Sequence, residues 1–94
     1  MKRIQRHLLI AGQVQRVYFR DTTLRLAQQL GLSGWVRNRR DGRVELVIQG
    51  DPAAVATLAD WCHDGPPAAR VDAVEIIDEP LDPSLTCFTV RPTH

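Results

Sequence analysis

The chain has few cysteines, few aromatic residues and no long apolar run. Its two cysteines, Cys62 and Cys87, are far apart and form no CxxC pair, which argues against a disulfide framework and predicts free, buried thiols. No apolar stretch approaches the roughly 20 residues that a membrane-spanning helix needs. The run HLLIA after the basic N-terminus is also too short for a signal sequence. We therefore expect a soluble, cytoplasmic protein that has no contact with membranes.

The length and composition favour one globular domain. A chain of 94 residues can bury roughly 60 to 70% of its unfolded surface without metals or disulfides. Hydrophobic residues make up 44% of the chain and charged residues 24%, as in ordinary globular proteins. We expect a single domain over residues 1–94, and a monomer.

Basic and acidic residues are distributed unevenly along the chain. Residues 1–40 contain nine Lys or Arg and a single acidic residue, Asp21, whereas residues 41–94 contain three Arg and ten acidic residues. The first part therefore carries a formal charge of +8 and the second a charge of -7. A positive field around residues 12–20 would favour an anionic ligand.

Apolar periodicity and turn residues predict alternating strands and helices, without repeats or linkers. Leu24, Ala27 and Leu30 have helical spacing, and Gly31 follows where a C-terminal glycine cap is expected. The predicted elements are a strand at 7–12, a helix over about 20–30, strands at 34–38 and 44–50, a helix from 52 to about 63, a strand at 71–77 and a last short strand at 87–91.

Local signals support this order of elements. The Asp41-Gly42 pair predicts a hairpin turn, and Asp51 followed by Pro52 predicts a capped helix start. Apolar residues alternate along 44–50, so one face of this strand should meet the helices. The order β-α-β-β-α-β predicts an α+β, ferredoxin-like sandwich. Its antiparallel four-stranded sheet would carry both helices on one face, leave the other face open, and be extended by a short terminal strand.

The segment GQVQRVYFR at 12–20 connects the first predicted strand to the first predicted helix. Backbone N–H groups in such a connection can converge on an anion. Arg20 ends the segment, where its guanidinium could clamp a phosphate through two parallel hydrogen bonds. Taken alone, Arg20 would more often be a solvated residue of the first helical turn, so the interpretation needs support from the rest of the chain.

That support comes from several separated motifs, whose order resembles the acylphosphatases, small enzymes of the same α+β fold. The motifs are VQRVYFR (14–20), LGLSGWVRN (30–38), DGRVE (41–45), GPPAARV (65–71) and FTVR (88–91). The resemblance implies that Arg20 binds the phosphate and that Asn38 orients the attacking water. It also implies a phosphate-binding loop made of Gln15, Arg16, Val17, Tyr18, Phe19 and Arg20, with the backbone of residues 15–19 as the cradle.

The implied activity is hydrolysis of an acyl phosphate to a carboxylate and inorganic phosphate, with no metal and no other cofactor. The carboxylate has a pKa of about 4 to 5, so it can leave without being protonated. A loose phosphoryl-transfer transition state needs mainly positioning and charge neutralisation, which an arginine and converging N–H groups can supply. In the family, the substrate's own phosphate is thought to accept the proton of the water.

Arg16 departs from the family pattern V-Q-G-V-x-F-R, which has glycine at this position. If the glycine serves a positive φ or a close approach to phosphate, an arginine there is strained and crowds the loop. Alternatively, Arg16 adds a second cation to the site. We favour the first interpretation, under which glycine at position 16 would raise activity.

The alternatives to an active enzyme differ in class. One is a domain that binds phosphate or acyl phosphate without turnover, or that belongs to a carbamoyl-phosphate-using system, and Arg16 keeps this alternative open. The other is a nucleic-acid-binding module, because the same element order builds RNA-recognition domains. The predicted strand 44–50 has no aromatic residue and no RNA-binding consensus run, so this module ranks well below the enzyme.

The remaining polar residues have ordinary interpretations. The histidines lack metal-ligand spacing and are not expected to form a site; they are His7, His63 and His94. Three arginines near the predicted hairpin turn are interpreted as a solvated tip; they are Arg37, Arg39 and Arg40.

Overall fold

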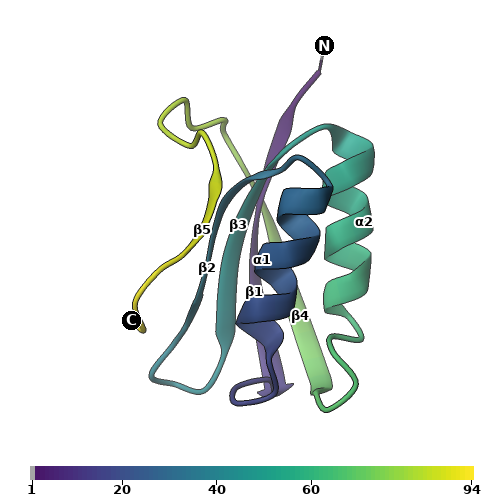
Figure 1. Ribbon diagram of the computed structural model, residues 1–94, viewed down its shortest axis with the longest axis vertical. Coiled ribbons are helices and arrows are strands. Elements are labelled where there is room, and N and C mark those ends of the chain that lie inside the picture. Colours follow the sequence, from purple (N-terminus) through teal and green to yellow (C-terminus); the bar gives the residue numbers. More distant parts are fainter. Residues whose placement is uncertain (1) are drawn as a thin grey trace.

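A computed structural model describes residues 2–94 and shows the order β-α-β-β-α-β followed by a short fifth strand (Figure 1). This confirms the predicted α+β class and the predicted order. The elements are β1 (Ile4–Gln13), α1 (Phe19–Gln29), β2 (Ser33–Asn38), β3 (Val44–Gly50), α2 (Pro52–Cys62), β4 (Arg70–Glu79) and β5 (Phe88–Val90).

The strands form one sheet in the order β4-β1-β3-β2-β5. Pairs β1–β3, β1–β4 and β2–β3 are antiparallel, as predicted. Strand β5 pairs with β2 in parallel, so the complete sheet is mixed. The chain continues along the same edge, where the Arg91 N–H donates to the Val36 carbonyl and the His94 N–H to the Asn38 carbonyl. The C-terminal segment therefore lies beside the end of β2.

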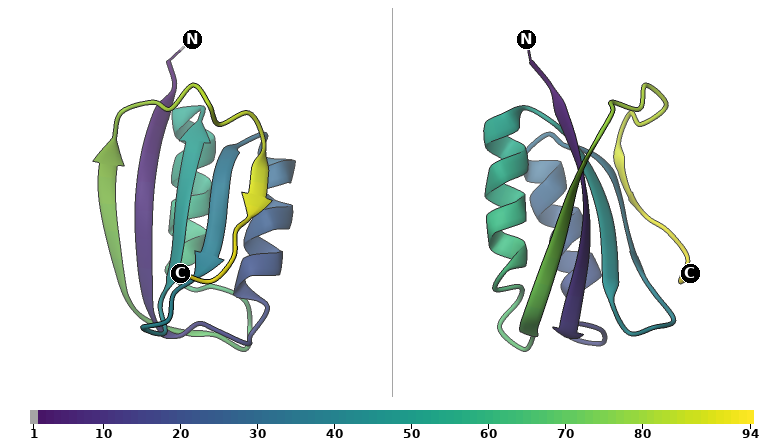
Figure 2. Two further views of the ribbon diagram at one scale, coloured as in Figure 1. Left: turned by 90° about the vertical axis from the view of Figure 1, so that its left-hand side faces the viewer. Right: turned by 180° about the vertical axis from the view of Figure 1, so that it is seen from behind.

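Both helices cover one face of the sheet, and Figure 2 shows the other face without a helix. The side chains that alternate toward the helices are fully buried, because each strand has one apolar face. They are Leu8 and Ile10 of β1, Val36 of β2, and Val44, Leu46 and Ile48 of β3, which share a core with Val55 and Leu58 of α2.

The two helices begin differently. The Asp51 carboxylate caps α2 by accepting from the N–H groups of Ala53 and Ala54, at 3.0 and 3.3 Å, as the sequence predicts. Helix α1 has no side-chain cap at Tyr18. Its C-terminus is followed by Gly31 at φ +69°, which confirms the predicted glycine cap. The uncapped end of α1 leaves N–H donors available to a ligand.

The helix-free face is not open over its central strand, contrary to the prediction. Glu45, Val47 and Gln49 of β3 point away from the helices, yet they are only 4%, 4% and 1% exposed. The Gln49 side chain accepts from the Asp82 N–H at 2.7 Å and donates to the Asp82 carbonyl at 3.1 Å. Neighbouring side chains and the segment after β4 thus cover a face that has no helix.

The cysteine prediction is half right. Cys62 is buried in α2, and burial raises the pKa of its thiol to about 12. Cys87 is exposed, because it directly precedes β5 and the next residue, Phe88, occupies the buried side of that strand. Both thiols are free. None of the helices formed by residues 2–94 is long and apolar enough to cross a membrane.

Candidate active site

The connection between β1 and α1 alternates between buried and exposed side chains. Val17 and Phe19 are buried, at 7% and 2% exposed, whereas Arg16, Tyr18 and Arg20 are exposed. Phe19 packs on Trp61 of α2 with ring centroids 5.2 Å apart. Apolar side chains therefore anchor this loop to the core, and the polar side chains between them face outward.

Gly65 makes room for the anchor. A Cβ atom at Gly65 would lie 2.6 Å from Cε2 of Phe19, and φ at this glycine is +70°. Any larger residue would therefore have to displace the Phe19 ring and adopt a backbone conformation that L-residues avoid. The loop after α2 thus helps to hold the loop before α1.

Two residues of the β1–α1 loop have left-handed backbone conformations. Arg16 has φ +64° and Tyr18 has φ +65°, and no other non-glycine residue within 2–94 has a positive φ. This conformation costs an L-residue roughly 1 to 2 kcal/mol, and such strain concentrates at ligand-binding sites. A positive φ is thus required at position 16, where glycine was expected.

The backbone of the same loop has unused donors. The N–H groups of residues 15–19 donate to no other residue within 2–94. Since α1 begins at Phe19 without a side-chain cap, the partial positive charge of its N-terminus adds to these donors. The loop can therefore bind an anion through these N–H donors.

A cavity of about 520 Å³ lies against the loop and is lined by residues of four segments. It brings together five predicted site residues, which are Arg16, Tyr18, Phe19, Arg20 and Asn38. The side chains of two other predicted loop residues, Gln15 and Val17, do not line it. Three further lining residues were not predicted from the sequence; they are Val14, Asp21 and Val90.

Val90 belongs to β5 and reaches the cavity because β5 pairs with β2. No short-range sequence signal shows a parallel pairing between segments so far apart, so this residue could not have been found. Asp21 directly follows Arg20 and could have been considered. Its carboxylate pairs with Arg25, one turn later in α1, at 3.0 Å.

The two arginines of the cavity have no carboxylate partner in the described part of the chain. Neither Arg16 nor Arg20 forms an ion pair within residues 2–94. The Asp21 carboxylate, the acidic group in the lining, is already paired with Arg25. The cavity therefore carries two unneutralised guanidinium groups.

Asn38 ends β2 and lines the cavity. The residue is 9% exposed, and its Oδ1 atom is buried without a hydrogen-bond partner in the described chain. Leaving such an acceptor unsatisfied costs roughly 1 to 3 kcal/mol. A water molecule or another donor that reaches this atom would remove that cost.

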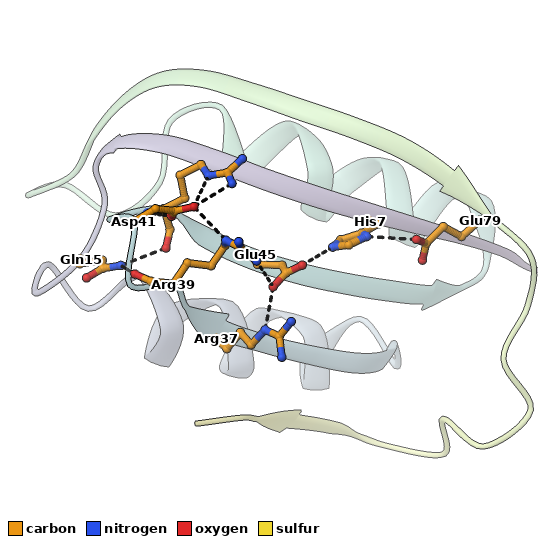
Figure 3. A network of polar contacts seen from close by, with 8 residues as sticks. His7, Gln15, Arg37, Arg39, Asp41, Glu45 and Glu79 are labelled. Atoms are coloured by element: carbon orange, nitrogen blue, oxygen red, sulfur yellow. Dashed lines mark hydrogen bonds and ion pairs between the residues drawn. The ribbon is translucent and has the colours of Figure 1, made fainter. Parts of the chain in front are cut away.

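Gln15 connects the loop to the β2–β3 turn. Its Nε2 donates to the carbonyls of Arg39 and Arg43, at 2.6 and 3.0 Å (Figure 3). Arg39 directly follows Asn38, so this contact fixes the distance between the loop and the asparagine. The side chain of Gln15 thus holds the two halves of the site together.

The hairpin arginines are not a solvated tip, contrary to the prediction for two of them. The Arg37 Nε donates to Glu45 at 2.7 Å, and Arg39 contacts both Asp41 at 3.1 Å and Glu45 at 3.4 Å (Figure 3). The reason is the register, which places Arg37 directly opposite Glu45. Arg40 is exposed, as predicted.

His7 also belongs to this network. Its Nε2 lies 2.6 Å from Glu45 and its Nδ1 lies 3.0 Å from Glu79. Burial alone would raise the pKa of Glu45, but hydrogen bonds from Arg37 and His7 outweigh it and lower that pKa. Within residues 2–94, no three His, Cys, Asp or Glu side chains are grouped to hold a metal ion.

Comparisons with known proteins show that the chain belongs to one family. A family model described as Acylphosphatase matches residues 6–90. An acylphosphatase of Rubrobacter xylanophilus is 52% identical over 87% of this chain and 74% of its own length. One from Thermococcus kodakarensis is 55% identical over 81% of this chain and 84% of its own. The structure of an acylphosphatase from Coxiella burnetii superposes with a TM-score of 0.89 at 35% identity, covering 95% of this chain and 93% of that one.

Proposed function

Because the chain belongs to the acylphosphatase family, we propose that it hydrolyses acyl phosphates in the cavity between the β1–α1 loop and Asn38. The activity follows from relatives at about half identity over most of the chain: the protein is an acylphosphatase, a hydrolase of acyl phosphates. The roles of individual residues, given next, are our proposal. They assume one domain that acts as a monomer.

Arg20 and the loop backbone bind the phosphoryl group in this proposal. The guanidinium offers two parallel N–H donors to two phosphoryl oxygens. The free N–H groups of residues 15–19 and the N-terminus of α1 point donors at the same anion. These groups neutralise the equatorial oxygens as the bond to the leaving group breaks, without any reorganisation of water.

Asn38 holds the attacking water, and its unpartnered Oδ1 is the observation that carries the proposal. A buried acceptor without a protein donor in the described chain can bind a water, and the residue that carries it lines the same cavity as Arg20. A water that donates a hydrogen bond to Oδ1 keeps a lone pair free to attack phosphorus. The asparagine therefore orients the nucleophile rather than the substrate.

The proposed reaction is an in-line displacement at phosphorus. The oxygen of the water forms a new P–O bond, and the bond between phosphorus and the acyl oxygen breaks. The acyl oxygen leaves with the electron pair as a carboxylate, which needs no proton because its pKa is about 4 to 5. The proton of the water passes to a phosphoryl oxygen, so the products are a carboxylate and inorganic phosphate. Inorganic phosphate should accordingly inhibit competitively.

The nucleic-acid alternative loses support from the helix-free face. RNA-recognition domains stack bases on exposed aromatic residues of that face. Here Trp35 is 8% exposed, and the guanidinium groups of Arg37 and Arg91 both lie over its ring, each with Cζ 4.6 Å from the ring centroid. The indole is thus already stacked on both partners.

The test is phosphate release from benzoyl phosphate and from p-nitrophenyl phosphate, each with and without EDTA. We expect rapid release from benzoyl phosphate in both conditions, because Arg20 and the amides supply the positive charge. Release from p-nitrophenyl phosphate should be slower, because p-nitrophenolate is a more basic leaving group than benzoate and so gains less from a site that supplies only positive charge and positioning. Comparable rates on the two substrates would contradict this mechanism, and binding of phosphate without any turnover would favour a non-catalytic domain.

A further inference from the structure

We propose that Arg16 makes this site select acyl phosphates whose acyl part carries a second negative charge. The inference rests on the proposed function and specifies its substrate class. It concerns the position at which the chain departs from the family's glycine. A suitable substrate is the monophosphate anhydride of a dicarboxylic acid, which presents a phosphate at one end and a carboxylate at the other.

The position of Arg16 in the cavity is the first argument. Arg16 and Arg20 come from the same loop, both line the cavity, and neither has a carboxylate partner within the described residues. Elsewhere in the protein, arginines that lie near acidic residues are paired with them, as Arg37 is with Glu45 and Arg25 with Asp21. An arginine that stays unpaired beside a ligand cavity is available to an anionic ligand.

The second argument is that different side chains contact the phosphoryl part and the acyl part of the substrate. In the proposed mechanism, Arg20, the loop amides and Asn38 already contact the phosphoryl group and its attacking water. A cavity of about 520 Å³ is within the usual range for sites that hold a whole small molecule, so it also has room for the acyl part. Of the charged side chains in the lining, Asp21 is paired with Arg25, so the guanidinium of Arg16 is the charged group left to meet that part. Its planar fork matches a carboxylate.

The backbone at position 16 is the third argument. Its φ of +64° is unfavourable for arginine and would be unstrained for glycine. Among residues 2–94, no ion pair of Arg16 offsets this strain. An anionic acyl group would supply the missing contact on binding. An exposed cation of this kind acts through a field that salt screens, so its effect should depend on ionic strength.

The experiment compares acetyl phosphate with succinyl phosphate, whose acyl part ends in a free carboxylate. The readout is the selectivity ratio, which is kcat/KM for succinyl phosphate divided by kcat/KM for acetyl phosphate. In Arg16→Gln the ratio should fall about tenfold at low salt, the equivalent of about 1.4 kcal/mol for one charge-assisted contact. At 0.5 M salt the fall should be smaller.

Two further variants isolate the cause. Arg16→Gly also removes the charge but relieves the backbone strain, so the same loss of selectivity in both variants assigns the effect to charge. Arg40→Gln removes an exposed arginine that does not line the cavity, and it should leave the ratio unchanged.

The outcomes separate this inference from the function on which it rests. An equal loss on both substrates would mean that Arg16 contacts the phosphate, and no loss on either would mean that it contacts nothing. Either result overturns the inference and leaves the acylphosphatase activity standing. If no acyl phosphate is hydrolysed by the wild-type protein, the proposed function fails and the inference fails with it.

Discussion

The protein uses arginines in two regions, and their surroundings are opposite. At the β2–β3 hairpin, Arg37, Arg39 and Arg43 form ion pairs with Glu45 or Asp41, at 2.7 to 3.4 Å. In the β1–α1 loop, Arg16 and Arg20 line a cavity and have no such partner within 2–94. The paired arginines stabilise the hairpin, whereas the unpaired arginines of the loop are available to bind an anionic ligand.

The backbones of the two regions differ in the same way as their arginines: hydrogen bonds pair the hairpin backbone, whereas N–H groups of the loop have no partner within residues 2–94. The hairpin has a regular antiparallel register up to Asn38, opposite Val44. The loop holds two residues at positive φ and leaves the N–H groups of 15–19 free. Gln15 joins the two regions through the carbonyls of Arg39 and Arg43. The hairpin thus satisfies most of its own polar groups, whereas the loop keeps its donors and cations available to a ligand.

Removing Arg20, the cation that we propose binds the phosphate, should have the largest effect. We expect Arg20→Ala to lower kcat/KM for benzoyl phosphate by a factor on the order of 10³ or more, as for other arginines that neutralise a transferring phosphoryl group. Inorganic phosphate should no longer bind, which isothermal titration can measure. Arg40→Ala is the matched control, because it removes an exposed arginine outside the cavity. Normal phosphate binding by Arg20→Ala would refute the assigned role.

Asn38→Ala should come next and should separate chemistry from binding. The variant loses the acceptor for the water but keeps Arg20 and the loop amides, so kcat should fall by a factor on the order of 10². The dissociation constant for inorganic phosphate should change little. If Asn38→Ala abolished phosphate binding as completely as Arg20→Ala, the division of roles between the two residues would be wrong.

Removing the charge of Glu45 from the paired hairpin should lower the stability of the fold and leave kcat nearly unchanged. Glu45 is 4% exposed and contacts Arg37, Arg39 and His7. We expect Glu45→Gln to lower the free energy of unfolding at pH 7 by about 2 kcal/mol, because it removes one charge from a largely buried cluster. Urea titration gives the value, and kcat should stay within about threefold of wild type if the hairpin keeps its register.

The pH dependence of this effect has a definite sign. The pKa of Glu45 is lowered in the folded protein, so its ionised form adds stability above its ordinary pKa of about 4.3. That contribution disappears as the pH falls through the lowered pKa, where the protonated side chain resembles glutamine. The difference between wild type and Glu45→Gln should therefore be complete at pH 6 to 7 and shrink below about pH 4. A difference that stayed constant down to pH 3 would show that the charge of Glu45 contributes nothing.

Removing the hydrogen bonds of Gln15, which connect the loop to the hairpin, should lower kcat less than the changes at Arg20 and Asn38. Gln15→Leu removes both hydrogen bonds to the hairpin carbonyls while keeping a side chain of similar length. We expect kcat to fall about tenfold, since a small displacement of the loop from Asn38 misaligns water and phosphorus. Gln49→Leu is the matched control, because it breaks two similar bonds to Asp82 away from the cavity. Equal losses of kcat in both variants would indicate a general effect on stability instead.

Most of the fold could be predicted because its signals are local. The cap at Asp51 and the proline after it placed α2 within one residue of its observed end at Cys62. Strand β1 extends further than predicted, from Ile4 to Gln13, because its first residues pair with the end of β3. That pairing joins segments more than 40 residues apart and leaves no local mark.

The site could be predicted only in part, for the same reason. Arg20, Asn38 and the loop were found through a pattern of several motifs, and the structure places both residues on one cavity. The contribution of Val90 depends on the parallel β2–β5 pairing and had no signal. The Arg37–Glu45 pair did have one, because a turn centred on Asp41 puts these two positions opposite each other. Treating the hairpin arginines one by one concealed it.

The smallest expected effect concerns the strain at Arg16. Arg16→Gly should raise the free energy of unfolding by about 0.5 to 1 kcal/mol, which is the strain of a left-handed arginine less the entropy that glycine gains in the unfolded chain. Arg16→Gln is the control, because it keeps a side chain in the left-handed conformation and removes only the charge. Any stabilisation in Arg16→Gln would reflect weaker repulsion between Arg16 and Arg20, and it should vanish at 0.5 M salt. Stabilisation in Arg16→Gly should persist there. If the glycine variant were no more stable than the glutamine variant at high salt, the left-handed conformation would carry no net strain, and the loop would differ from the hairpin only in its unpaired charges.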